Sequence, residues 1–170
     1  MHKKKVTLLD GAVGTSLWEK TDHKVPVWRY NVENPEIVTR LHQEYVAAGA
    51  EIILANTFGA NAGNVKTSDY TVRQIVKNAM KLASFAIAGK AKIALAIGPL
   101  SGLLEPYGDI STDSAFRMFD EQIGYGAEGK PDLIFIQTFT DVKMLKIALK
   151  VANQHDLPVF ASMSFDQTGH

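Results

Sequence analysis

The chain has 170 residues, of which 46% are hydrophobic, and its 18 basic residues balance 18 acidic ones; these values are typical of one globular domain with a sizeable core. The balanced charge excludes a global electrostatic field that would attract nucleic acid or an anionic membrane. The absence of cysteine excludes a disulfide framework, a thiolate zinc site and a cysteine nucleophile within these residues.

No apolar run approaches the roughly 20 residues that a membrane-spanning helix needs. The N-terminal stretch, MHKKKVTLLDGAVG, lacks the long apolar segment of a signal peptide. We therefore expect a cytoplasmic protein that has neither nucleic acid nor a membrane among its partners.

Five short apolar runs alternate with longer segments along the chain, and each run is a predicted strand. Their bounds are 6–9, 52–55, 92–97, 133–136 and 159–163. The runs are continuous rather than alternately apolar and polar, which indicates strands buried on both faces, as in a parallel sheet.

Four amphipathic segments between these runs are predicted helices, because apolar residues recur in them at helical spacing. The apolar stripe of the first includes Tyr45. The expected caps or first residues are, in chain order, Asn34, Thr71, Thr112 or Asp113, and Thr140. The alternation of strand and helix predicts an α/β fold with a parallel sheet and right-handed crossovers. It leaves open a doubly wound sheet of five strands and part of a (β/α)8 barrel.

Small or polar residues follow the predicted strands. They are Asp10-Gly11, Asn56-Thr57-Phe58-Gly59, Gly98-Pro99, Gln137-Thr138, and then Ser162, Ser164 and Asp166. Taken singly, such residues are as often found capping turns or satisfying backbone groups as binding a ligand. Taken together they favour a polar pocket, because the carboxyl ends of parallel strands share the edge where α/β folds bind ligands.

Two other kinds of site have weaker support. The stretch GAVGT has neither the lysine of a P-loop nor the third glycine of a dinucleotide fingerprint. A free-standing doubly wound domain that binds a phosphorylated ligand between Gly11 and Gly14 stays open as an alternative. The histidines lack the HxxxH or HxH spacing of a metal site, so no metal ligand is assigned.

Five stretches of the chain resemble, in order and spacing, the homocysteine-binding domain of the homocysteine S-methyltransferases. They are LLDGAVGT, NPEIVTRLHQEYVAAGAEIILANTFGAN, IGPLSGLLEPYGD, FIQTFTDVKMLKIAL and FASMSFDQTGH. The resemblance covers nearly the whole chain, and the long block that ends in NTFGAN is its most specific part. The closing MSFDQTGH is more similar to the cobalamin-dependent methionine synthase branch than to the betaine-dependent one.

The resemblance implies a (β/α)8 barrel that methylates homocysteine to methionine. In this family a zinc ion held by three cysteine thiolates binds the substrate sulfur, and cobalamin can act through other domains. The family holds the amino acid end of the substrate with the Asp-Gly after the first strand and a Glu after the fourth, which correspond here to Asp10, Gly11 and Gln137. Asp10 would then face the substrate ammonium, and Gly11 would let the backbone approach the ligand closely.

The zinc cysteines of the family lie on later strands, which this chain lacks. Residues 1–170 are therefore interpreted as the N-terminal part of the barrel domain, truncated after the fifth strand. No catalytic residue is assigned, and methyl transfer by this chain alone is not expected. Asn56, Thr57 and Phe58 are expected to shape the substrate pocket.

A glutamine at position 137, where the family typically has glutamate, predicts weaker binding of the amino acid, because an amide lacks the charge that attracts an ammonium. The open edges of a partial barrel, at 6–9 and 159–163, predict self-association or pairing with the missing C-terminal half of the barrel. The alternative function is a non-catalytic half-barrel that binds an amino acid or serves in assembly.

Overall fold

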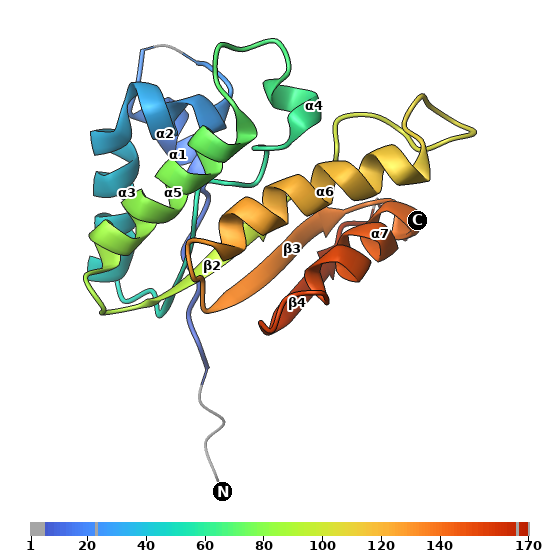
Figure 1. Ribbon diagram of the computed structural model, residues 1–170. Coiled ribbons are helices and arrows are strands. Elements are labelled where there is room, and N and C mark those ends of the chain that lie inside the picture. Colours follow the sequence, from blue (N-terminus) through green and yellow to red (C-terminus); the bar gives the residue numbers. More distant parts are fainter. Residues whose placement is uncertain (1–5, 23, 166, 170) are drawn as a thin grey trace, which may run out of the picture.

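The computed structural model describes residues 6–22, 24–165 and 167–169, and its centre is a four-stranded parallel sheet (Figure 1). The strands are β1 (Ile52–Leu54), β2 (Lys92–Ile97), β3 (Leu133–Phe139) and β4 (Val159–Met163). They pair in chain order, β1-β2-β3-β4, and every pair is parallel. Asp166, which was expected at the carboxyl edge, lies outside the described residues.

The described residues form seven α-helices and one 3-10 helix, whereas four helices were predicted. They are α1 (Val13–Glu19), η1 (Val27–Arg29), α2 (Tyr30–Glu33), α3 (Pro35–Ala47), α4 (Ala62–Val65), α5 (Val72–Ile87), α6 (Thr112–Ala127) and α7 (Val142–Ala152). The long helices α3, α5, α6 and α7 are the predicted four. The others have seven residues or fewer, which is too short for a helical period to be read from the sequence.

The first predicted strand, 6–9, does not form a strand in the structure. Within 6–9 only Leu9 pairs with the sheet, through an isolated parallel bridge to Ile52, and Leu8 accepts backbone hydrogen bonds from Glu51 and Ile52 through its carbonyl oxygen. Val6 is 75% exposed. An edge segment has a pairing partner on one side only, and this one also lacks a covered face, so its pairing stops at a single bridge.

The helix starts agree with the predictions except at α7. Thr71 caps α5 in a capping box with Gln74, and the side chain of Ser111 caps α6. The cap of α7 is Asp141 and not Thr140. The carboxylate of Asp141 accepts two backbone N–H bonds of the first turn, which is a stronger interaction with a helix N-terminus than a hydroxyl would provide.

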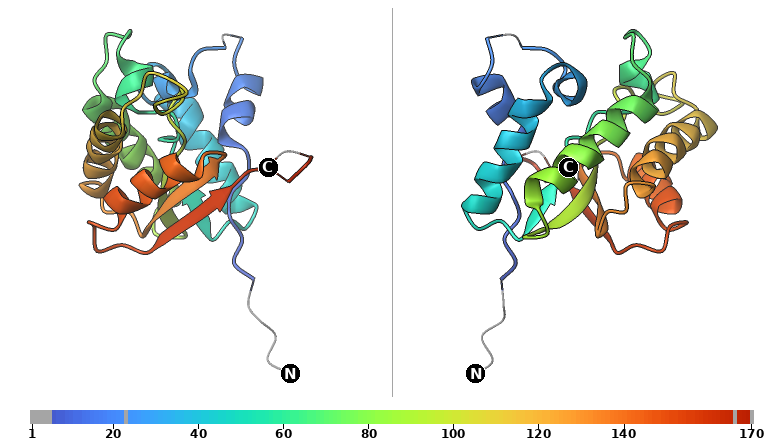
Figure 2. Two further views of the ribbon diagram at one scale, coloured as in Figure 1. Left: turned by 90° about the vertical axis from the view of Figure 1, so that its right-hand side faces the viewer. Right: turned by 60° about the vertical axis from the view of Figure 1, so that its left-hand side comes forward.

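The sheet has one face covered by helices. Helices α3, α5, α6 and α7 pack side by side in chain order, and α5, α6 and α7 lie over the sheet (Figure 2). The main core lies between these helices and the outer face of the strands, and it includes the fully buried Ile53, Leu95, Ile134, Ile136 and Phe139. This arrangement has the strand and helix order of a (β/α)8 barrel wall.

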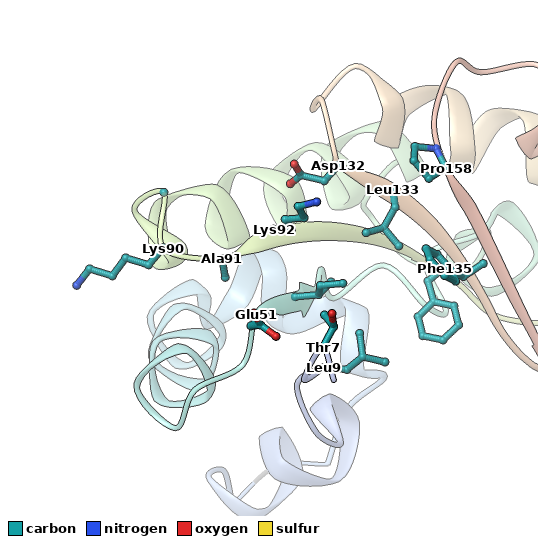
Figure 3. A pocket seen from close by; sticks show the side chains of 13 residues that line it. Thr7, Leu9, Glu51, Lys90, Ala91, Lys92, Asp132, Leu133, Phe135 and Pro158 are labelled. Atoms are coloured by element: carbon teal, nitrogen blue, oxygen red, sulfur yellow. The ribbon is translucent and has the colours of Figure 1, made fainter. Parts of the chain in front are cut away.

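The opposite, inner face carries no helix among the described residues. Its own smaller cluster contains Leu54 and Leu133 with the half-buried Phe135. Phe160 lies beside Phe135, with ring centroids 6.4 Å apart, and is 57% exposed. A cavity of about 910 Å³ opens on this face toward the amino ends of the strands (Figure 3).

Candidate functional site

Asp10 is fastened to the neighbouring strand at the carboxyl edge of the sheet. Its Oδ2 accepts a hydrogen bond of 2.8 Å from the backbone N–H of Leu54, and its own N–H donates to the carbonyl oxygen of Ile52 at 3.0 Å. Desolvation by burial outweighs the backbone hydrogen bonds to the carboxyl group and raises its pKa from 3.8 to about 7. A cation beside the second carboxylate oxygen would favour the ionised form and lower this pKa again.

Gly11 is in contact with a side chain that the sequence analysis had assigned only to an apolar stripe. A Cβ atom at Gly11 would lie 2.9 Å from the hydroxyl oxygen of Tyr45. That hydroxyl donates to the carbonyl oxygen of Ala12 at 3.1 Å, and it lies 3.3 Å from the hydroxyl of Ser16. The absent side chain of Gly11 therefore makes room for Tyr45, which fixes the backbone just after Asp10.

Asn56 is buried and its amide is engaged within the chain. Its Nδ2 donates to the carbonyl oxygen of Val27 and to Oδ1 of Asn31, both at 2.9 Å. Asn31 donates in return to the backbone carbonyl oxygen of Asn56 at 2.8 Å. This amide pair ties the end of β1 to η1 and α2, and Asn31 was not among the residues that the sequence singled out.

Thr57 is fully buried and links β1 to β2. Its hydroxyl donates to the carbonyl oxygen of Ala96 at 2.7 Å and accepts from the N–H of the same residue at 3.1 Å. Its backbone carbonyl oxygen accepts from Nε2 of Gln122 at 2.6 Å. Thr57 therefore sets the shape of the pocket edge through the backbone, and Gln122 of α6 supports it from behind.

Phe58 is 40% exposed and lies directly against Gly98, the residue that follows β2. A Cβ atom at Gly98 would be 2.6 Å from Cζ of the phenyl ring, and the N–H of Gly98 donates to the carbonyl oxygen of Phe58 at 3.0 Å. The ring thus forms an apolar surface at the carboxyl edge, and glycine is required beneath it.

Gln137 lies within β3 rather than after it, because the strand continues to Phe139. It is half-buried. The register with β4 changes here, since Ile136 pairs with Ala161 and Phe139 pairs with Met163, so three steps along β3 match two along β4. Gln137 is therefore part of a β-bulge, a feature found often beside binding sites.

The six predicted site residues thus lie on three segments at one edge of the sheet.

A comparison with protein families gives a match over nearly the whole chain. The model of the family described as homocysteine S-methyltransferase matches residues 7–170. The chain belongs to the homocysteine S-methyltransferase family.

Two sequence relatives show how much of a family member the chain spans. It is 26% identical to methionine synthase of Mycobacterium tuberculosis over 198 residues, covering 97% of this chain and 16% of that protein. It is 25% identical to S-methylmethionine–homocysteine S-methyltransferase BHMT2 of Pongo abelii, covering 96% of this chain and 44% of that protein. The chain therefore spans less than half the length of these relatives.

The fold agrees with that of a solved family member. The metallated form of the homocysteine methyltransferase MmuM from Escherichia coli superposes with a TM-score of 0.85 at 18% identity, covering 99% of this chain and 66% of that one. The expected fold class, an α/β part of a (β/α)8 barrel, is confirmed, and the doubly wound alternative is thereby excluded.

The large cavity of this family member is not the predicted site. It is lined by Glu51, Lys92 and Asp132 at the amino ends of the strands (Figure 3), and none of the six predicted site residues lines it. Barrels of this type bind their substrates at the carboxyl ends, so we interpret the cavity as barrel interior.

The described part of the chain contains no group of three or more His, Cys, Asp and Glu side chains that could hold a metal ion. Within the same part, no helix is both long and apolar enough to cross a membrane. The six predicted site residues supply hydrogen-bonding and apolar groups together with one carboxylate, that of the half-buried Asp10.

Proposed function

We propose that this chain forms the homocysteine-binding part of an S-methyltransferase barrel whose complete form makes methionine. The observation that supports this most strongly is Asp10, a carboxylate with a pKa raised to about 7 by burial at the edge where such barrels bind substrate. An amino acid ammonium is a suitable partner, because it would compensate the lost hydration of the carboxylate.

The other predicted residues have supporting roles in this proposal. Gln137 accepts a second hydrogen bond from the ammonium through its side-chain oxygen. Gly11 and Tyr45 hold the backbone beside the carboxylate, Thr57 keeps the ends of β1 and β2 together, and Phe58 contacts the apolar part of the ligand. Asn56 acts through the loop that it fixes.

The zinc ion that the family implies does not fit the side chains of this chain. The sequence contains no cysteine, and no metal-binding group is found among the described residues. The methyl-transfer step is therefore not assigned to these residues, and we propose that residues 1–170 alone do not methylate homocysteine. Cobalamin, implied through other domains, is likewise assigned no residue, and the cytoplasm is the proposed location.

Homocysteine binding to Asp10 can be tested by isothermal titration with a matched control. Asp132 makes the same kind of contact as Asp10, since its Oδ2 accepts from the N–H of Ile93 at 2.8 Å, but it lies at the amino edge. We expect Asp10→Asn to weaken homocysteine binding about tenfold or more and Asp132→Asn to leave it unchanged. Absence of binding to the wild-type chain, or equal loss in both variants, would overturn the proposal.

A second candidate function, the non-catalytic assembly half-barrel, is favoured by the inner face of the sheet. Phe160 is 57% exposed there and Leu8 is 53% exposed on the adjoining edge segment, and exposed apolar groups on an unpaired edge promote association. We expect sedimentation velocity to show self-association that Phe160→Ser reduces. A chain that stays monomeric at high concentration would contradict this candidate.

A further inference from the structure

The bulge in β3 decides which side chains face the inner side of the sheet. Along β3, Ile134 and Ile136 pack in the main core under the helices, while Leu133 and Phe135 belong to the inner cluster. Strict alternation would continue with Gln137 on the inner face and would also turn Phe139 inward. The structure instead buries Phe139 in the main core. One extra residue is therefore inserted between Gln137 and Phe139.

Thr138 is that inserted residue, and its backbone is strained. Its φ is +60°, a left-handed conformation that is uncommon for residues other than glycine and especially unfavourable for a β-branched one. The hydroxyl of Thr138 donates to the carbonyl oxygen of Gln137 at 2.7 Å. Such a conformation persists only where neighbouring contacts hold it.

Ser162 of β4 supplies one such contact. Its Oγ accepts a hydrogen bond of 3.2 Å from the backbone N–H of Thr138, in place of a backbone acceptor of the regular ladder. Beyond the bulge, the N–H of Ser164 donates to the carbonyl oxygen of Phe139 at 2.9 Å, so regular pairing resumes. The serine hydroxyl thus bonds the residue that follows Gln137.

We propose that Ser162 is a positioning residue for ligand binding: its hydroxyl holds the bulge at Thr138 and thereby fixes the backbone that presents Gln137 to the amino end of the substrate. This rests on the proposed function, in which Gln137 contacts the ligand. Ser162 acts through Gln137 and does not itself touch the substrate. The geometry assigns it this role because its hydroxyl accepts the backbone N–H of Thr138, the residue joined directly to Gln137.

Three variants at β4 separate positioning from general stability. Ser162→Ala removes the hydroxyl, Ser162→Thr keeps it, and Ser164→Ala is the matched control, because Ser164 bonds β3 through its backbone. We expect Ser162→Ala to weaken homocysteine binding about fivefold, as loss of one hydrogen bond would, with Ser162→Thr and Ser164→Ala within about twofold of wild type. In a Gln137→Ala background, Ser162→Ala should weaken binding no further.

A measurement without ligand completes the test. In amide NMR spectra of the 170-residue chain, Ser162→Ala should speed hydrogen exchange of the Thr138 amide and shift the side-chain amide signals of Gln137. Unchanged signals would overturn the positioning role. The positioning role would also be overturned if Ser162→Ala weakened homocysteine binding by the same factor in the Gln137→Ala background as in wild type. Failure of the wild-type chain to bind homocysteine would overturn the proposed function and this role together, whereas wild-type binding that Ser162→Ala leaves intact would overturn this role alone.

Discussion

The two edges of the sheet each hold an aspartate that accepts a backbone hydrogen bond from a neighbouring strand. Asp10 bonds Leu54 at the carboxyl edge and Asp132 bonds Ile93 at the amino edge, both at 2.8 Å. Asp132 is exposed whereas Asp10 is half-buried, and burial raises the pKa of Asp10 to about 7. Burial, and not the backbone hydrogen bond, is therefore what distinguishes the two carboxylates.

The largest expected effect comes from a group that is buried without any hydrogen bond. His42 on α3 is 0% exposed, both ring nitrogens lack a partner among the described residues, and burial lowers its pKa from 6.5 to about 4. The unfolded chain therefore binds a proton at His42 more readily between these values, so the contribution of His42 to stability should fall as pH drops from 6.5 to 4, by about 3 kcal/mol at 1.36 kcal/mol per pKa unit.

Denaturant unfolding at pH 7 and pH 4 checks the role of His42. His42→Leu should remove this part of the acid sensitivity, whereas the matched variant at the half-buried His155, His155→Leu, should keep it. If the change in unfolding free energy between pH 7 and pH 4 is the same in His42→Leu as in wild type, the burial of His42 does not contribute to the acid sensitivity.

The next effect separates the two aspartates directly. The folded-state pKa of Asp10 is raised from 3.8 to about 7, so the contribution of Asp10 to stability falls as pH rises through this range, opposite in sign to that of His42, and above pH 7 the full cost of its partly buried charge is present. We expect Asp10→Asn to raise the free energy of unfolding of the free chain at pH 8 by about 2 kcal/mol. This is less than the raised pKa alone would give at 1.36 kcal/mol per unit, because part of the carboxyl group reaches solvent.

Asp132→Asn should instead slightly destabilise the chain at pH 8, because an exposed carboxylate carries no such cost and the variant weakens a hydrogen bond. Thermal unfolding of both variants gives the comparison. Equal destabilisation by both variants would show that the burial of Asp10 does not lower the stability of the chain at pH 8.

A smaller effect concerns the ligand. An ammonium binds the ionised form of Asp10, whose pKa is raised to about 7 in the free chain, so homocysteine affinity should increase between pH 6 and pH 8 by about tenfold. Titration calorimetry at three pH values measures this. Asp10→Asn should give a flat profile in the same range, and a wild-type profile that is equally flat would argue against Asp10 as the ammonium partner.

The smallest effect sharpens the carboxyl edge further. Thr138 has a φ of +60°, which glycine adopts without steric cost, so Thr138→Gly should leave stability unchanged or raise it by up to about 1 kcal/mol. The exposed Thr140 has no positive φ, and Thr140→Gly should destabilise by a few tenths to about 1 kcal/mol. Chemical denaturation measures both variants, and equal destabilisation by the two would show that the positive φ of Thr138 has no energetic cost.

Sequence patterns predicted the regular parts of the barrel wall well. β2 and β4 have the predicted bounds, because a continuous apolar run bounded by turn residues leaves few alternatives. The start of α5 was predicted near Thr71, which is its N-cap. The segment 6–9 has the same apolar character but forms a single bridge. Strand formation there depends on neighbours that pack against it, and these are few because Val6 and Leu8 are exposed; a local pattern does not contain such information.

The site itself was predicted as a set of positions but not as contacts. The partners of Gly11, Asn56 and Thr57 are Tyr45, Asn31 and Gln122, and each lies on another element. Tyr45 and Gln122 occupy ordinary helix positions, where a residue type gives no signal of its own. Asn31 lies within the short helix α2, which is too short to predict from the sequence.

The sequence by itself determined the alternation of strands and helices, the polar residues at the strand ends and the membership of the family, because each of these depends on residues close together in the chain. The tertiary structure alone decided how deeply Asp10 is buried and where the register of β3 shifts beside Gln137. Both depend on contacts between residues far apart in sequence, from Asp10 to Leu54 and from Thr138 to Ser162. Burial and register are properties of packed neighbours, so no local pattern specifies them.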